Sequence, residues 1–118
     1  MPNTKPVGVA FSDPAISTFF LNAPVTKTAS FTLGGEENFV ICNGAAANVT
    51  VTLPSGAENI GRVVVIKNLS GTYTVISPTS NVKPANSGTA GTAILAATAG
   101  AWAMLVCEDG TNWVVMAS

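Results

Sequence analysis

The sequence predicts an all-β protein: a small antiparallel β-sandwich or barrel, jelly-roll-like, that carries an extended N-terminal arm. Two observations support this prediction. Apolar residues recur with the two-residue period of strands and almost nowhere with the period of a helix. Gly, Pro, Asn and Asp interrupt these runs at short intervals, so about seven or eight short strands are expected. Strands of this length and spacing are typical of small sandwiches and barrels.

The first 24 residues differ in character from the rest of the chain. Prolines at positions 2, 6, 14 and 24 divide this segment into short extended pieces and prevent a helix. We therefore expect residues 1–24 to form an extended arm and residues 25–118 to form a single all-β domain. The length of 118 residues is enough for one ordinary domain and too short for two.

Two central strands are predicted on either side of a loop. The segment NVTVTLP (48–54) alternates apolar and polar residues, which places its three apolar residues on one buried face. The segment RVVVIKN (62–68) is continuously apolar, and such a run is typical of a strand buried on both faces. After a short turn, YTVIS (73–77) forms the next strand.

The last part of the chain is predicted to be a surface loop followed by a hairpin. Residues 78–92 are rich in Pro, Gly, Ser and Asn and leave room for one short strand. Asp109-Gly110 between the apolar runs 102–107 and 113–117 indicates a tight hairpin. Gly34-Gly35 is expected to form a similar hairpin. The core residues expected from these patterns are Trp102, Val106, Val63, Val65 and Val51.

The charge content is low and excludes several partners. Charged residues make up 9% of the chain, against about 25% in typical soluble domains, and the net charge is −1. The surface is either covered by a partner or by copies of the chain, or simply neutral and polar. Five scattered Lys and Arg residues do not make a basic patch, so no nucleic-acid partner is expected. No apolar run reaches the roughly 18 residues of a membrane span, so no membrane partner is expected.

The residues that usually carry chemistry are sparse, and we expect no enzyme. The chain has no His, which removes the usual imidazole base. The carboxylate pairs Glu36-Glu37 and Glu108-Asp109 lie in turns, where solvation is the simpler interpretation. Cys42 and Cys107 close apolar runs and are expected to be free thiols. Neither a metal nor a cofactor is expected.

A glycine spacing near the middle of the chain invites comparison with a phosphate-binding loop. Gly56 and Gly61 are separated by four residues and followed by a cation, Arg62. A phosphate-binding loop needs Lys and then Ser or Thr, followed by a helix, whereas Val63 opens a β-branched strand here. The stretch is therefore interpreted as a strand–loop–strand connection in which Gly61 permits a tight start to the second strand.

Four short motifs occur in an order that resembles a module recurrent in structural proteins of tailed phages. They are TLP at 52–54, GR at 61–62, KN at 67–68 and DGTNW at 109–113, within a match that covers roughly residues 48–113. The opening KPVGVAFSDP (5–14) also resembles the N-terminal stretches of small phage virion proteins. The resemblance implies an all-β, usually trimeric virion component.

Within that family, the short chain and its arm favour a capsid decoration (cement) protein. Such a homotrimer would bind the major capsid protein on the outer surface of the virion head, after assembly in the host cytoplasm, and stabilise the shell. The alternatives are a tail-fibre or spike domain that binds a host receptor or glycan, and an unrelated small all-β binding module. The arm residues expected to contact the capsid or another partner are Val7, Val9, Phe11, Ile16, Phe19, Phe20 and Leu21.

Overall fold

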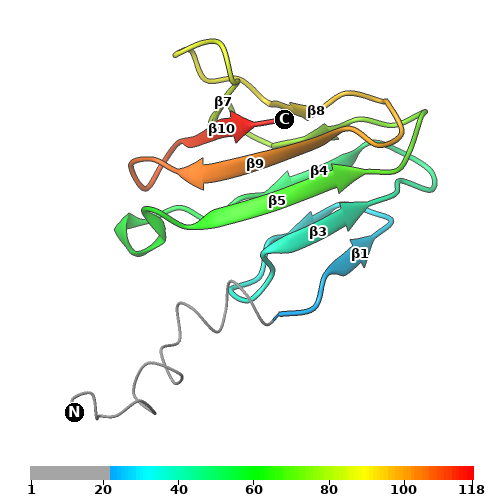
Figure 1. The fold of residues 1–118 in the computed structure, drawn as a ribbon, viewed down its shortest axis with the longest axis horizontal. Helices are drawn as coiled ribbons and strands as arrows, with labels where there is room; N and C mark the ends of the chain where they lie inside the picture. Colours follow the sequence, from blue (N-terminus) through cyan, green and yellow to red (C-terminus); the bar gives the residue numbers. More distant parts are fainter. Residues whose placement is uncertain (1–21) are drawn as a thin grey trace.

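The computed structural model describes residues 22–118, which form two β-sheets and contain no α-helix (Figure 1). One turn of 3-10 helix, η1, occupies Ala57–Asn59. The strands are β1 (Val25–Lys27), β2 (Phe31–Thr32), β3 (Phe39–Cys42), β4 (Val49–Thr52), β5 (Val63–Asn68), β6 (Val75–Ile76), β7 (Val82–Lys83), β8 (Ala93–Leu95), β9 (Trp102–Cys107) and β10 (Trp113–Ala117). The predicted all-β class is confirmed.

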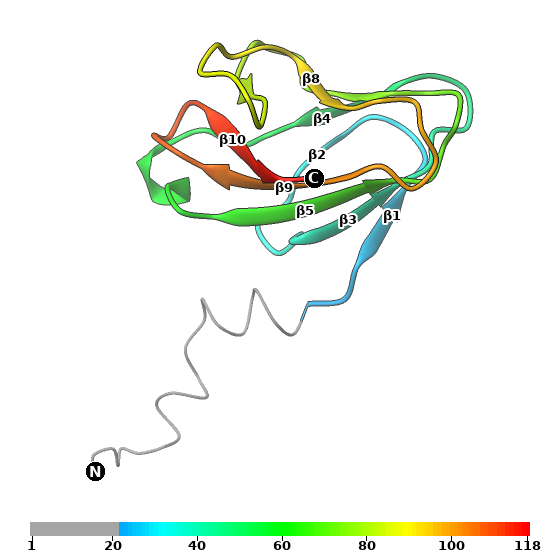
Figure 2. The ribbon, with the colours of Figure 1, turned by 45° about the horizontal axis from the view of Figure 1, so that its top comes forward.

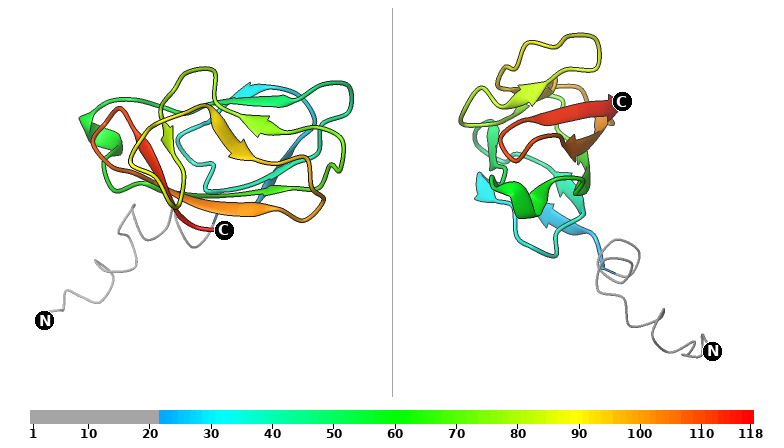
Figure 3. Two further views of the ribbon diagram at one scale, coloured as in Figure 1. Left: turned by 90° about the horizontal axis from the view of Figure 1, so that it is seen from above. Right: turned by 90° about the vertical axis from the view of Figure 1, so that its left-hand side faces the viewer.

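The chain passes from one sheet to the other after each of the first eight strands, and only β9 and β10 follow one another in the same sheet. The six-stranded sheet has the order β1-β3-β5-β9-β10-β7, and the four-stranded sheet has the order β2-β4-β6-β8. Odd and even strands up to β9 therefore lie in different sheets. Figures 2 and 3 show the resulting two layers, with β4 and β8 on one side and β3, β5 and β9 on the other.

This crossing makes both sheets mixed, so the expectation of antiparallel sheets was wrong. The pairs β1–β3, β3–β5, β2–β4, β4–β6 and β7–β10 are parallel. Only β5–β9, β9–β10 and β6–β8 are antiparallel among the described strands. Among β1 to β6, each strand that returns to its sheet after a visit to the other runs in its original direction, whereas β8 and β9 run opposite to β6 and β5. For the same reason no hairpin forms at Gly34-Gly35, because β2 and β3 lie in different sheets.

The hairpin at Asp109-Gly110 is confirmed. Strands β9 and β10 pair antiparallel through this turn. One carboxylate oxygen of Asp109 accepts hydrogen bonds from the backbone N–H groups of Thr111, at 3.0 Å, and Asn112, at 2.7 Å. Gly110 adopts a φ of 82°, a left-handed conformation that residues with a Cβ rarely take. The predicted short strand within 78–92 is also present, as β7.

Inward side chains of both sheets share one hydrophobic core. Val49, Val51 and Leu53 are buried from the four-stranded sheet, as their alternation predicted. From the other sheet, Val64 and Ile66 are fully buried. Strand β5 was expected to be buried on both faces. However, Val63 and Val65, which alternate with these two residues, are only half-buried. One face of β5 therefore packs in the core and the other forms part of the molecular surface.

Four of the five expected core residues lie on the wrong side of the six-stranded sheet. Val51 is in the core, whereas Val63, Val65 and Val106 are half-buried and Trp102 is 44% exposed. The residues that alternate with them along the strands, such as Val64 and Leu105, fill the core instead. Trp113 is the large core aromatic residue, with no exposed surface, and its Nε1–H donates a hydrogen bond to the Pro54 carbonyl at 3.1 Å.

The buried side chain of Asn68, at the end of β5, holds three loop backbone groups. Its Nδ2 donates hydrogen bonds to the carbonyls of Tyr73 and Ala96, each at 2.9 Å. Its Oδ1 accepts one from the backbone N–H of Ser70 at 3.0 Å. Buried backbone groups of this kind cost free energy when they lose their partners, so this amide stabilises the end of the body where the chain changes sheet.

We predict that Asn68→Ala lowers the free energy of unfolding by about 2–4 kcal/mol, because it leaves several buried polar groups unpaired. The exposed Asn48 accepts one hydrogen bond, from the Thr74 backbone N–H, and provides the control. Asn48→Ala should cost less than about 1 kcal/mol, since water can replace its amide. Urea denaturation of the three proteins measures both values, and equal losses would contradict this role of Asn68.

Candidate docking face

The arm residues predicted to bind a partner lie outside the described residues 22–118. They are Val7, Val9, Phe11, Ile16, Phe19, Phe20 and Leu21. Asn22, where the described chain begins, donates a hydrogen bond from Nδ2 to the Glu36 carbonyl at 2.7 Å. The arm therefore joins the body beside β1, an edge strand of the six-stranded sheet (Figure 1).

The candidate site in the body is the outer face of the six-stranded sheet. Strand register brings its side chains into rows: Val63 pairs with Val106 and Val106 with Val114, and Val65 pairs with Met104. Lys67 pairs with both Ile41 and Trp102 in a third row. We call this surface the outer face and define it by Ile41, Val63, Val65, Trp102, Met104, Val106 and Val114. All seven side chains are half-buried or exposed, and the strand register places them on the same side of neighbouring strands.

Polar residues border the outer face on its margins. Thr26 lies on β1 beside Ile41, and Lys83 lies on β7 beside Val114. Lys83 forms an ion pair with Glu108, with 2.8 Å between Nζ and Oε1. Lys67 occupies the row at one end of the face. The face thus has an apolar centre and a polar border, which is the usual layout of a protein–protein interface.

The outward side of the four-stranded sheet provides an internal comparison. Its outward residues are Thr32, Thr50, Thr52, Ile76 and Ala93. Threonine suits a strand and also hydrogen-bonds to water, so this side needs no cover. Both sheets belong to one small domain, yet one presents Thr to the outside and the other presents Val, Met and Trp. The difference marks the outer face as a surface suited to a partner.

The motifs that resemble phage structural proteins are used within the body itself. The Gly56 N–H donates a hydrogen bond to the Gly110 carbonyl at 2.7 Å, and the Gly61 N–H donates to the Cys107 carbonyl at 2.8 Å. A Cβ added at Gly110 would lie 3.1 Å from backbone atoms of Gly56. Gly61 has a φ of 86°, consistent with the tight strand start predicted for it. These motifs therefore fasten the loop after β4 to the β9–β10 turn.

Arg62 fastens a second loop to the start of β5. Its guanidinium donates hydrogen bonds to the carbonyls of Gly34 and Glu37, the latter at 3.0 Å. Burial lowers the pKa of Arg62, and the charge of Glu37 acts in the opposite direction. The Glu37 carboxylate accepts a hydrogen bond from the Gly34 N–H at 2.8 Å and lies 2.9 Å from the Lys27 ammonium. That backbone hydrogen bond and then the Lys27 ion pair lower the pKa of Glu37, against the opposing effect of burial.

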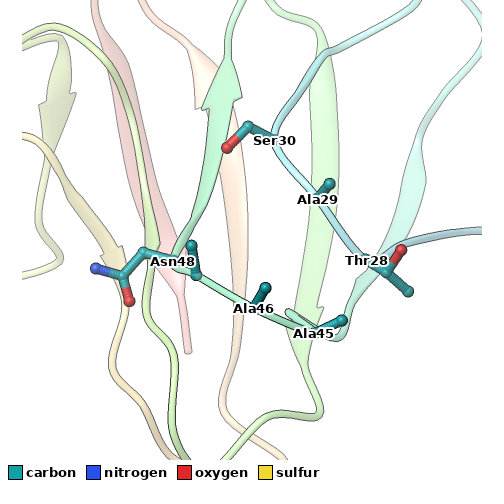
Figure 4. Close-up of a pocket in the computed structure, with 7 residues that line it drawn as sticks. Thr28, Ala29, Ser30, Ala45, Ala46 and Asn48 are labelled. Carbon is teal, nitrogen blue, oxygen red and sulfur yellow. The ribbon is translucent and has the colours of Figure 1, made fainter.

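A shallow hollow at the opposite end of the body lies between residues 28–30 and 45–48 (Figure 4). Its lining is mostly Ala, and no charged side chain takes part. Ser30 accepts a hydrogen bond from the backbone N–H of Thr50, and Asn48 accepts one from Thr74. Both side chains thus serve the backbone, and the hollow offers little chemistry for a specific ligand.

Groups suited to metal or nucleophilic chemistry are scarce in the described part of the chain. No three His, Cys, Asp or Glu residues gather there in a way that could hold a metal ion. Cys42 and Cys107 are both buried free thiols, as predicted. Burial raises the pKa of Cys42 to about 11, so this thiol stays protonated and unreactive near neutral pH.

Residues 22–118 include no helix with the length and apolar character needed to cross a membrane. Comparison with known protein families gives no matching family, and comparison with curated proteins gives no matching relative. The candidate site therefore stands on the geometry and composition of the described residues.

Sequence reasoning did not find the outer face, although a signal was present. The continuous apolar run of β5 was interpreted as burial of both faces by this chain. Val63 and Val65 on its second face are only half-buried by this chain. Trp102 and Val106 of β9 were likewise assigned to the core, although they lie on its outward side.

We predict that Glu37 contributes to stability in a pH-dependent way. Its pKa is lower in the folded chain than in the unfolded chain, so its contribution is present above pH ~4.3, the unfolded value, and is lost as the pH falls through the folded value. Glu37→Gln should destabilise the protein by about 1 kcal/mol at pH 7 and by clearly less at pH 3. Glu36→Gln, at an exposed neighbour, is the control. Thermal unfolding at both pH values tests this, and a pH-independent difference would contradict it.

Proposed function

We propose that this chain is a phage virion structural protein: a homotrimeric decoration (cement) protein that binds the major capsid protein on the outside of the head. The observation that carries the proposal is the apolar outer face of the body. Among residues 22–118, no cluster of His, Cys, Asp and Glu could hold a metal ion. Such a body is suited to holding surfaces together. The order of the motifs TLP, GR, KN and DGTNW supports the assignment to tailed phages.

In this proposal the chain has a mechanical role and no catalytic one. The two sheets form a sandwich-like body, and the arm at residues 1–24 reaches from the β1 edge to the capsid. Extended chain covers about 3.3 Å per residue, so such an arm spans tens of ångströms. Each apolar arm side chain that becomes fully buried contributes about 1.5–3 kcal/mol to shell binding. Buried interface area would then offset the pressure of packaged DNA.

A tail-fibre or spike domain that binds a host receptor or glycan is the second candidate. Trp102 favours it, because this residue is 44% exposed on a sheet face, and aromatic rings stack on sugars. Lys67 lies directly beside it in the strand register. A change in Trp102 fluorescence on addition of host surface polysaccharide would favour this candidate over decoration.

We predict that the full-length variant Phe19→Asp/Phe20→Asp loses most of its affinity for capsids that lack this chain. Two buried Phe side chains contribute about 3–6 kcal/mol, so the dissociation constant should rise at least ~100-fold. Co-sedimentation with such capsids measures the loss.

The control variant for this experiment is Ala45→Asp/Ala46→Asp, which adds the same charge to an exposed loop of the body. It should sediment with capsids like the parent protein. Equal binding of the arm variant and the control would refute the role of the arm. If none of the three proteins sedimented with capsids, the decoration function itself would be wrong.

A further inference from the structure

We propose that the outer face is the self-association surface of this protein, and that two further copies of the chain cover it around a threefold axis. This inference rests on the homotrimer of the proposed function and assigns the surface through which the trimer forms. Ile41, Val65, Met104 and Val106, which are half-buried within one subunit, would then become interface core residues.

Composition favours a second copy of this chain as the occupant. The outer face is apolar in its centre and carries single cations near its margins, at Lys67 and Lys83. A partner of strongly charged character would find no complementary charge there. Copies of this chain have a net charge of −1 and present the same apolar surface to one another, so they meet with little electrostatic repulsion.

The width of the face fits three copies. It covers four strands, β3, β5, β9 and β10, which at about 4.8 Å each span roughly 19 Å. Three faces of that width, arranged as the sides of a triangular prism, place the axis roughly 5.5 Å from each sheet. Packed sheets lie about 10 Å apart, so each normally lies about 5 Å from the midplane. One layer of side chains from each subunit therefore fills such a prism, whereas four faces would leave a hole of several ångströms.

The outer face supplies part of the area that a specific interface buries. Five residues at about 3.3 Å give the face a length of roughly 17 Å and an area on the order of 300 Å². In a trimer the three faces together bury roughly 900 Å², shared among three pairwise contacts, and a specific interface buries roughly 1,000 Å². The polar margins around each face must therefore take part in the contacts.

The position of Lys67 makes the two ends of the proposed trimer different. It shares a row with Ile41 and Trp102 at one end of the face, away from Val63 and Val106 at the other. Three Lys67 ammonium groups can reach solvent at the mouth of the prism, because a Lys stem lies along apolar surface while its charge stays in water. The Val-rich end is then closed and dry. At the other end the Lys67 ammonium groups extend into water, while Ile41 and Trp102 of the same row stay within the interface.

The experiment compares the oligomeric state of full-length variants by sedimentation equilibrium from about 1 to 100 µM. The parent protein should sediment at three times its chain mass of 11.9 kDa. The variant Val63→Thr/Val65→Thr/Val106→Thr gives the outer face the Thr-rich character of the other sheet. Because Val and Thr have similar shapes and both favour strands, the subunit should remain folded. Its dissociation constant for self-association should rise at least ~100-fold.

The matched control makes the reverse change on the other sheet. Thr50→Val/Thr52→Val adds apolar groups to the outward side of β4 and should leave the trimer unchanged. A parent protein that stays monomeric at 100 µM would overturn the proposal, as would a folded threonine variant that associates like the parent. If the threonine variant fails to fold, Met104→Lys is judged by the same criterion.

The experiments distinguish a wrong trimer surface from a wrong decoration function. A trimer that the threonine substitutions dissociate, but that does not sediment with capsids, would refute decoration and retain the assignment of the outer face. A monomer that sediments with capsids would refute the trimer and retain decoration.

Discussion

The passage of the chain from one sheet to the other after each early strand is the constraint on which the rest of the structure depends. Because β1, β3 and β5 return to the same sheet in the same direction, Val40 and Ile66 fall into one inward row. Outward residues fall into rows in the same way. A half-exposed apolar residue on β5 therefore always lies beside others on neighbouring strands, and the outer face is continuous rather than a scatter of single side chains.

The polar residues of the body serve mainly to hold the loops that this winding requires. Asn68 binds three backbone groups where the chain leaves β5, and Arg62 binds two where it enters. The motifs around Gly56 and Gly110 join the remaining loops through backbone hydrogen bonds. Residues that looked like the signature of a function are thus explained by the fold. The surface that remains for a partner is apolar, which agrees with a role in assembly.

The sequence allowed the strand content to be predicted, and with it the inward face of β4 and the Asp109-Gly110 hairpin, because these depend on neighbouring residues. It did not reveal which strands pair. Short turns such as Gly34-Gly35 are compatible both with a hairpin and with a crossing to the other sheet, and only the packing of the whole chain decides between them. The inward face of β9 was predicted wrongly for a similar reason. Trp102 and Leu105 are both apolar, and alternation alone does not say which of them turns inward.

Trp102 reports directly on the proposed covering of the outer face by copies of this chain. Trp113 has no exposed surface, whereas Trp102 is 44% exposed in the single subunit. Acrylamide quenching of the parent protein, measured from nanomolar to about 100 µM, follows the accessibility of Trp102 as copies associate. The account predicts strong quenching in dilute samples and protection at high concentration, with the midpoint at the concentration where the sedimenting mass changes. Quenching that stays strong when the protein is a trimer would contradict it.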